Sequence, residues 1–196
     1  MCCSRYAYTH SIIANPASMF EPYHTMENEQ KYLIKNVFQH PDYEYYDYGF
    51  CLMETMEEIE FNENVQPACL PQSCSDECPD HSDVLIAGWG LNDYEAHTSS
   101  ETLQKAKVPI VPRATCSDLY AGIKTINDYT TCAGYVGNRG IVPCYGDEGG
   151  GVMCYRNGYF QLDAILGDVR YCRDSELPSL HSRVCMVLDW IESIIG

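Results

Sequence analysis

The residue types best suited to chemistry in this chain lie in one glycine-rich run, CYGDEGGGVMC, at residues 144–154. Two acids, Asp147 and Glu148, stand there among four glycines and between two cysteines. Glycine at this density indicates a backbone that adopts conformations forbidden to other residues, or that approaches another group closely. An ordinary surface turn needs only one or two glycines. We therefore interpret the run as a site built from backbone N–H groups, with a plain loop as the alternative.

The run resembles the nucleophile loop of trypsin- and chymotrypsin-like serine proteases, which reads Cys-x-Gly-Asp-Ser-Gly-Gly-Pro, two further residues and Cys. Both cysteines, three of the glycines and Asp147 are in register with that pattern. Glu148 stands where the family has its catalytic serine, and Gly151 stands where it has proline. A carboxylate cannot replace an activated serine hydroxyl as the nucleophile of acyl transfer in a site built for serine. The resemblance therefore predicts the loop without its reactive atom.

Several further motifs extend the resemblance over about residues 28–196. They are similar to the family's His-Pro-x-Tyr turn at residues 40–43, Val-x-Pro-x-Cys-Leu-Pro at 65–71, Gly-Trp-Gly at 88–90, Leu-Gln-x-Ala-x-x-Pro-Ile-Val at 103–111, Cys-Ala-Gly at 132–134 and the strand before the terminal helix at 178–184. Each motif is weak alone, and together they are specific.

The resemblance leaves no catalytic residue intact. The position of the catalytic aspartate falls on Gly49, and Asp47, two residues away, would not supply the missing acceptor. No histidine has the family's context, since its place falls on Met1 or Cys2, and neither His10 nor His24 is followed by cysteine. The degenerate catalytic positions are therefore Glu148 and Gly49. The roles of the missing triad are those of the general serine-protease template.

Other parts of the site are also altered. Gly146 and Glu148 are expected to present oxyanion-hole-like N–H groups, and the Glu148 carboxylate either occupies that space itself or points to water. Asp147 matches the aspartate that pairs with the new amino terminus of an activated family member. Because the chain has no Ile-Val-Gly-Gly start, Asp147 needs another partner, or the loop stays partly disordered. The pocket-like positions are Val142, Gly167 and Ser179, which do not favour a Lys or Arg substrate.

Twelve cysteines argue for an oxidising compartment. The resemblance implies the disulfides Cys116–Cys132 and Cys144–Cys172. It places the partner of Cys154 on Val84, so Cys78 is expected to substitute for it.

The remaining cysteines are less constrained. Cys51 is interpreted as a buried free thiol. Cys74 and Cys78, four residues apart, either close on each other or bind a metal, although zinc is disfavoured because no second ligand pair follows. The partners of Cys2, Cys3, Cys69 and Cys185 stay open.

A formal charge of −16 argues against nucleic acid and anionic membranes as partners. It favours solubility, with a cationic partner as the alternative. No apolar stretch reaches the 18 residues of a membrane helix. The first residues lack a signal-peptide pattern, whereas the cysteines and the resemblance imply an extracellular protein. We therefore expect a start truncated relative to a secreted parent.

No cofactor or structural metal is expected. The one alternative is a calcium loop, since Glu21, Glu27 and Glu29 lie close together and carboxylates suit a hard cation. A solvated acidic loop is the favoured interpretation.

The fold class implied by the resemblance is all-β, with two Greek-key barrels of which the first is incomplete. Residues 1–83 are expected to form the partial first half and residues 84–196 the second half. A stripe of apolar residues at Val187, Trp190, Ile191 and Ile194 has the spacing of an amphipathic helix, which predicts a helix at the carboxyl end.

We therefore hypothesise a trypsin-like serine protease homologue that is inactive and binds a protein ligand or acts as a component of a protease cascade. An active serine endopeptidase and a truncated, non-functional product are the alternatives.

Overall fold

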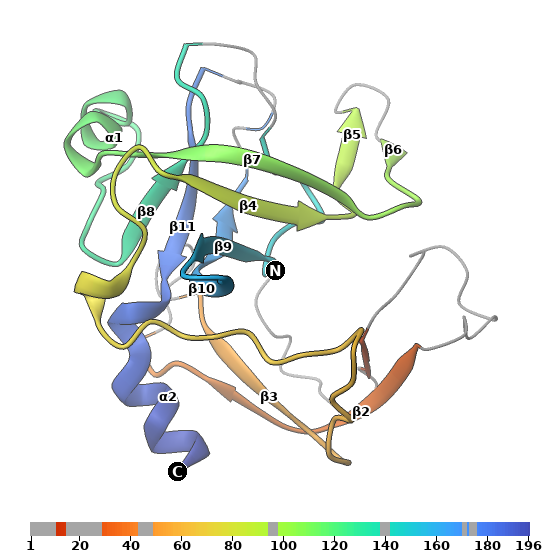
Figure 1. Ribbon diagram of the computed structural model, residues 1–196. Coiled ribbons are helices and arrows are strands. Elements are labelled where there is room, and N and C mark those ends of the chain that lie inside the picture. Colours follow the sequence, from red (N-terminus) through yellow and green to blue (C-terminus); the bar gives the residue numbers. More distant parts are fainter. Residues whose placement is uncertain are drawn as a thin grey trace.

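The computed structural model describes residues 11–14, 29–42, 49–93, 98–137, 142–169, 172 and 176–196. Within them the chain is mostly β, with one closed barrel and a short terminal helix, which confirms the predicted trypsin-like all-β fold (Figure 1). That the first barrel is incomplete stays a prediction. The strands are β1 (Ser11–Ala14), β2 (Gln30–Gln39), β3 (Cys51–Thr55), β4 (Asp83–Gly88), β5 (Leu91–Asp93), β6 (Thr98–Ser99), β7 (Gln104–Val111), β8 (Thr130–Ala133), β9 (Gly151–Arg156), β10 (Tyr159–Asp168) and β11 (Ser179–Arg183). The helices are α1 (Arg113–Leu119) and α2 (Leu188–Ile195), with 3-10 turns at Cys74–Asp76 and Val184–Val187.

Six antiparallel strands close into a barrel in the order β10-β11-β8-β7-β4-β9. Alternate residues of a strand face opposite sides of the sheet, so Val84 and Ile86 of β4 point inward. With the apolar residues of the other strands they fill the core, and Val84, Val108 and Ala164 have no exposed surface. Closure leaves this half of the molecule without free strand edges around the ring.

A second apolar cluster seals the barrel beneath α1. It contains the disulfide Cys116–Cys132 and Tyr120, which is fully buried. The Tyr120 hydroxyl donates a hydrogen bond of 2.6 Å to the Pro178 carbonyl. This contact fixes the start of β11, which enters the barrel at the next residue.

The amino-terminal half contributes a three-stranded antiparallel sheet in the order β1-β2-β3. Figure 1 shows this sheet below the barrel, with α2 beside both. The predicted terminal helix is confirmed by α2. Ile191 of α2 and Val187 of the preceding 3-10 turn are buried with Phe50 between sheet and barrel. His40 is also buried, and its ring lies 4.9 Å from that of Trp190 in an edge-to-face arrangement.

The disulfides confirm part of the cysteine prediction and correct the rest. Cys116–Cys132 and Cys144–Cys172 are present, and Cys78 pairs with Cys154 as the expected substitute. Val84, at the usual position of that partner, lies directly opposite Cys154 in the β4–β9 register.

Two cysteine predictions are wrong. Cys74 and Cys78 neither bridge each other nor bind a metal, because Cys74 pairs with Cys185, 111 residues away. Cys51 is disulfide-bonded and half-buried rather than a buried free thiol. The prediction for Cys51 depended on the small apolar residue that the family has at this position. That residue type carries no information on whether a cysteine there forms a disulfide.

Candidate functional site

The glycine loop that leads into strand β9 of the barrel requires glycine at two positions of its backbone. Gly146 has φ of 97° and Gly149 has φ of 88°, a region that favours glycine because it lacks a Cβ. The loop is anchored on β10, since Gly149 N–H donates to the Leu166 carbonyl at 2.9 Å and Leu166 N–H donates to the Gly150 carbonyl at 2.7 Å. Its position relative to the barrel is therefore fixed by backbone hydrogen bonds.

The Glu148 side chain folds back on its own loop. Gly146 N–H donates a hydrogen bond of 2.7 Å to Glu148 Oε2, and Glu148 is half-buried. A hydrogen bond to an ionised acceptor is among the stronger kinds. Of the two arrangements left open by the sequence, the structure has the carboxylate on the loop's N–H group rather than directed to water.

Asp147 has found partners inside the protein. Gly90 N–H donates to Asp147 Oδ1 at 2.8 Å, and Cys144 N–H donates to Asp147 Oδ2 at 3.0 Å. The carboxylate lies in a cradle that only glycines can form. A Cβ on Gly88 would stand 1.9 Å from Asp147 Oδ1, and a Cβ on Gly90 would stand 2.5 Å from Asp147 Cγ.

This cradle answers the question that the sequence left open. Two backbone N–H groups, those of Gly90 and Cys144, stabilise the charge of the aspartate. The glycines on either side of Trp89 were recognised in the sequence as a motif, but their use was not. Gly90 and Asp147 are 57 residues apart, and no local pattern connects them.

An open pocket of about 450 Å³ adjoins the loop. Apolar residues and the Cys144–Cys172 disulfide form much of its wall, and Asp147 and Lys105 are the charged residues that line it. Val142, one of the predicted pocket residues, lines it with Leu166. The wall of the pocket therefore combines apolar residues with polar groups, among them Asp147 and Lys105.

The other two predicted pocket residues are not among the residues that line this pocket. Ser179 is buried, donates a hydrogen bond of 2.8 Å to the Ala133 carbonyl and is 2.9 Å from His181 Nε2. Gly167 lies against β11, where an added Cβ would meet the Leu180 carbonyl at 2.9 Å. A shared pocket of Val142, Gly167 and Ser179 stays a prediction.

His181 is a buried histidine that the sequence analysis did not single out. Because the Ser179 hydroxyl donates to Ala133, His181 Nε2 carries the proton in the Ser179 contact and Nδ1 is left without a hydrogen-bond partner. Burial lowers the pKa of His181 to about 3, so the ring is neutral. An unpaired acceptor on a neutral ring is tolerated where a buried charge would not be.

Of the remaining triad positions, Gly49 lies among the described residues, whereas the expected histidine positions, Met1 and Cys2, do not. Gly49 precedes Phe50, which is buried against α2, and as glycine it has no side-chain acceptor. Among the described histidines, His40 contacts Trp190, His181 contacts Ser179, and His81 donates its backbone N–H to Ile110. His10, His24, Asp47, Met1, Cys2 and Cys3 lie outside the described residues, as do Glu21 and Glu27 of the suggested calcium loop.

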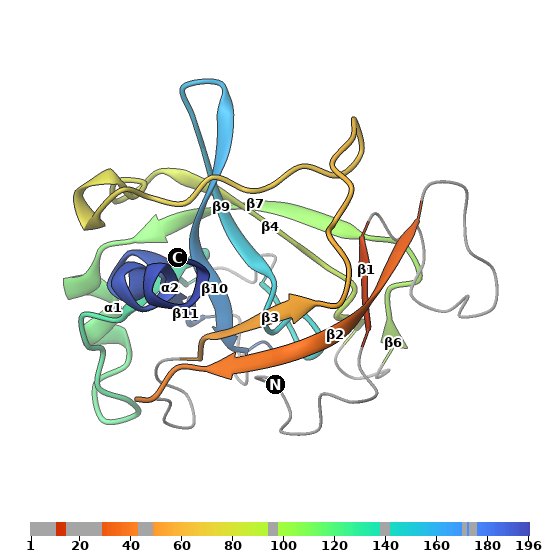
Figure 2. The same ribbon diagram turned by 90° about the horizontal axis from the view of Figure 1, so that it is seen from below.

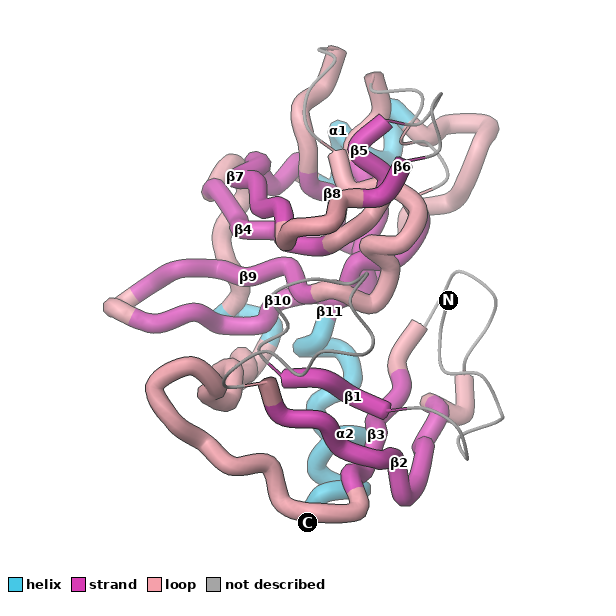
Figure 3. The backbone as a smooth tube through the Cα atoms, turned by 90° about the vertical axis from the view of Figure 1, so that its right-hand side faces the viewer, coloured by secondary structure: helices cyan, strands magenta, loops and turns pink. Residues whose placement is uncertain are grey.

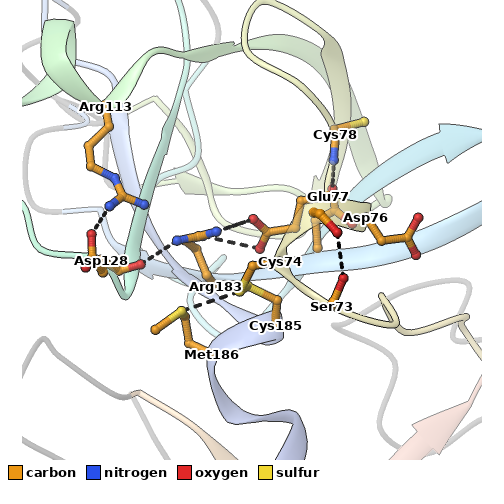
Figure 4. Close-up of polar contacts among 12 residues, drawn as sticks. Ser73, Cys74, Asp76, Glu77, Cys78, Arg113, Asp128, Arg183, Cys185 and Met186 are labelled. Atoms are coloured by element: carbon orange, nitrogen blue, oxygen red, sulfur yellow. Dashed lines mark hydrogen bonds and ion pairs between the residues drawn. A yellow bond between two sulfur atoms is a disulfide. The ribbon is translucent and has the colours of Figure 1, made fainter.

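A second polar cluster, which we call the clamp, ties the segment between the two halves to the barrel. Arg183 Nη2 lies 2.6 Å from Glu77 Oε2, and its Nη1 donates 2.7 Å to the Asp128 carbonyl (Figure 4). Cys78 N–H donates 2.7 Å to Asp163 Oδ2, and the disulfides Cys74–Cys185 and Cys78–Cys154 flank these contacts. The clamp was not predicted, because its members are brought together only by the folded barrel.

Burial dominates the electrostatics of the clamp. It raises the pKa of Glu77 above its usual value, against the hydrogen bonds and charge of Arg183. It likewise raises the pKa of Asp163, against hydrogen bonds from Cys78 and Gln161. Within the described residues, Cys78, Cys154 and Asp163 are the one group close enough to share a metal, but the two sulfurs are bonded to each other.

A closed six-stranded antiparallel barrel that carries a glycine loop with an aspartate held beneath it defines the class of trypsin-like β-barrel proteins. Comparison with known proteins agrees. The sequence profile of the trypsin family matches residues 15–191, and the chain belongs to this family. In the part of the chain that the structure describes, no helix has the length and apolar character needed to cross a membrane.

Curated relatives are similar at about one third identity. The chain is 32% identical over 185 residues to trypsin Tyr p 3.0101 of Tyrophagus putrescentiae, which covers 92% of this chain and 63% of that protein. It is 34% identical over 167 residues to phenoloxidase-activating factor 3 of Holotrichia diomphalia, covering 81% and 46%. It is 31% identical over 161 residues to transmembrane protease serine 9 of Rattus norvegicus, covering 81% and 15%. The chain thus spans less than two thirds of the length of these relatives.

Proposed function

We propose that this protein is a non-catalytic member of the trypsin family that acts by binding a protein partner. The observation that carries the proposal is the hydrogen bond from Gly146 N–H to the carboxylate of Glu148. The residue at the position of the nucleophile is an acid, and it occupies an N–H group that would otherwise be free to hold the oxyanion of a substrate.

Three features support the absence of catalysis. Glu148 cannot act as the serine does, and Gly49 offers no acceptor to orient a histidine. Of the described histidines, His40 contacts Trp190 and His181 contacts Ser179. Removing the nucleophile or the histidine of such a triad costs about a millionfold in rate. No neighbouring group in the described loop supplies a substitute.

The scaffold nevertheless has the features of a folded, specific protein. The Asp147 cradle, the closed barrel and the four disulfides with both cysteines among the described residues support one fixed arrangement of the loop. A non-functional truncated product would not be expected to satisfy both acids of the loop. One relative, phenoloxidase-activating factor 3, is named for the activation of an enzyme. By analogy we infer a role as a component of an extracellular protease cascade, consistent with the disulfides.

We also propose that the chain divides near residue 83 into a partial first barrel and a complete second barrel. The three-stranded sheet before β4 and the closed barrel from β4 onward support this division.

Labelling with an active-site fluorophosphonate tests the catalytic part of the proposal. The purified protein and its Glu148→Ser variant are treated with the probe beside an active trypsin of the same concentration. We expect labelling of trypsin alone, because Glu148→Ser restores a hydroxyl but no histidine. Labelling of the unchanged protein would show that it is an active endopeptidase. Labelling of Glu148→Ser alone would show that a histidine and its orienting group are present after all.

A further inference from the structure

The hairpin formed by β9 and β10 projects away from the body of the molecule (Figures 2 and 3). Its turn consists of two residues, Asn157 and Gly158, because Arg156 and Tyr159 pair across the strands. Both turn residues have a positive φ, 53° for Asn157 and 90° for Gly158. Asparagine followed by glycine is the sequence that favours a two-residue turn of this kind. The hairpin therefore places an asparagine directly before a glycine at its tip.

Asn157 is the one asparagine of the chain that a glycine follows. This pair of residues is chemically reactive, because the backbone nitrogen of the second can attack the side-chain amide of the first and close a five-membered ring. A side chain on the second residue would crowd that nitrogen, whereas glycine has no Cβ and a permissive backbone. The sequence of the turn thus supplies both reacting groups.

The turn also leaves both groups accessible. Asn157 and Gly158 are exposed, and a Cβ built on Gly158 would meet no atom within 4 Å. Within the described residues, neither the Asn157 side-chain amide nor the Gly158 N–H is hydrogen-bonded. Ring closure therefore breaks no hydrogen bond of these two groups, and local motion at such a tip costs little free energy.

Other asparagines of the described chain are held differently. Asn62 Oδ1 accepts a hydrogen bond of 2.8 Å from Asn64 N–H, and Asn127 Oδ1 accepts one of 3.1 Å from Tyr129 N–H. Both Asn62 and Asn127 are followed by an acidic residue, whose side chain crowds the attacking nitrogen. They serve as internal controls for the reactivity of Asn157.

We propose that Asn157 is a site of spontaneous modification, at which its side-chain amide is converted to a carboxylate through a cyclic imide with Gly158. The Gly158 nitrogen forms a bond to Asn157 Cγ, the Cγ–Nδ2 bond breaks, and ammonia leaves with the proton of the Gly158 N–H. One water molecule then opens the ring at either of its two carbonyl carbons. Opening at Cγ gives aspartate, and opening at the backbone carbonyl carbon gives isoaspartate, in which the main chain runs through Cγ.

The modification changes the exposed aromatic residues of the hairpin. Tyr155 and Phe160 lie opposite each other in the strand register, with their ring centroids 4.9 Å apart, and they are 62% and 44% exposed. Isoaspartate lengthens the two-residue turn by one backbone atom, so the register on either side of the turn no longer closes as before. Because exposed apolar patches mark contact surfaces, the modification alters the hairpin as a surface for binding.

Peptide mapping by mass spectrometry tests the proposal on the purified protein with its disulfides intact. After incubation at neutral pH, we expect Asn157 to convert at least about tenfold faster than Asn62 or Asn127, a difference of about 1.4 kcal/mol in activation free energy. The product should contain both aspartate and isoaspartate, because the ring opens in two directions. Asn157→Gln is the matched control, since it keeps the amide but its longer side chain cannot close the same ring. Reduced protein in urea gives the rate of Asn157 without the hairpin.

The effect on the hairpin is measured by the nuclear Overhauser contact between the rings of Tyr155 and Phe160. We expect the incubated protein to lose this contact in proportion to its isoaspartate content. Asn157→Asp, which has the new charge on a normal backbone, should retain it. A contact that persists in the isoaspartate fraction would contradict the proposed change of the aromatic surface.

Three results would overturn the proposed site itself. Asn157 could stay unmodified in the folded protein while it converts in the reduced, unfolded protein. Asn62 or Asn127 could convert as fast as Asn157. The product could contain aspartate alone, which would indicate direct hydrolysis of the amide without a ring. None of these outcomes bears on fluorophosphonate labelling, so the proposed lack of catalysis is tested separately.

Discussion

Replacing Gly88 by alanine tests the cradle that holds Asp147. Alanine is compatible with the backbone there, because Gly88 does not have a positive φ. The three atoms nearest to an added Cβ all belong to Asp147: Oδ1 at 1.9 Å, Cγ at 2.8 Å and Cβ at 3.4 Å. The first two distances are far inside van der Waals contact, so either the methyl group or the carboxylate must move.

The expected loss of stability is set by whichever of two structural responses costs less free energy. If the carboxylate stays, the overpacked site costs about 1–3 kcal/mol. If it rotates away, the hydrogen bonds from Gly90 and Cys144 are lost, and each bond to a charged group contributes about 1.5–3 kcal/mol. We therefore expect Gly88→Ala to lower the free energy of unfolding by about 1–3 kcal/mol.

The Asp147→Ala background provides the control. There the carboxylate is absent and the nearest remaining atom is the β-carbon of residue 147 at 3.4 Å, an ordinary contact. Gly88→Ala should then change stability by less than about 0.5 kcal/mol, and the coupling in the double-mutant cycle should equal the clash. Urea unfolding with disulfides intact gives all four values, with fluorescence from Trp89, the neighbouring residue, as the probe. An equal cost of Gly88→Ala in both backgrounds would refute the cradle.

Three further predictions address the loop, the clamp and the buried histidine. In Glu148→Ala the Gly146 amide proton should shift upfield in NMR spectra and lose its response to acid. Glu148→Gln keeps an oxygen acceptor, so the Gly146 amide proton should stay near its original chemical shift. Unchanged Gly146 resonances in both variants would place the carboxylate in water. Arg183→Ala leaves Glu77 half-buried and unpaired and should lower the free energy of unfolding by about 3–5 kcal/mol. Arg183→Lys should lower it by an intermediate amount, because lysine cannot form the forked contact. Equal losses of stability for the two variants in chemical denaturation would argue against the forked contact. Because the pKa of His181 is lowered to about 3 in the folded state, only the unfolded state binds a proton at this residue from about pH 6.5 downward. The free energy of unfolding should therefore fall on acidification by up to about 1.4 kcal/mol per pH unit from this group. A His181→Gln variant whose stability has the same slope between pH 6 and 4.5 would contradict the assignment.

The acid response has an opposing contribution. The pKa values of Glu77 and Asp163 are raised by burial, so the folded state binds their protons first on acidification. That binding stabilises the folded state as the pH falls through the raised values, opposite in sign to His181. The His181→Gln comparison separates the two effects, because both carboxyls are unchanged in it.

Local motifs predicted the fold well because they carry a fixed geometry. Cys132 stands in the Cys-Ala-Gly motif, the resemblance implied its bridge to Cys116, and the structure has that bridge. The terminal helix followed from the spacing of its apolar residues, and Ile191 is buried as expected, although Ile194 at the same stripe is 36% exposed because the helix runs past the edge of the core. Motifs of this kind depend on neighbours in sequence.

Contacts between distant segments were beyond the reach of the sequence. Cys74 gave no signal for Cys185, 111 residues away, because no motif spans that separation. The need for a partner to Asp147 was evident, but Gly90 and Cys144 supply backbone N–H groups, which every residue except proline possesses. A partner that acts through its side chain can be recognised in the sequence by its residue type. A partner that acts through its backbone cannot be recognised in this way.

The two acids of the loop together explain how the site stays closed. Asp147 turns inward, where Gly88 and Gly90 leave space for its side chain. The N–H groups of Gly90 and Cys144 donate hydrogen bonds that stabilise the carboxylate there. Glu148 turns back and accepts from Gly146, within the same loop. A serine at that position would leave the Gly146 N–H open to a substrate carbonyl, and a loop without the cradle would need a cation for Asp147. Backbone N–H groups of the described chain therefore hydrogen-bond to both acids of the loop, and this arrangement supports the proposed non-catalytic role.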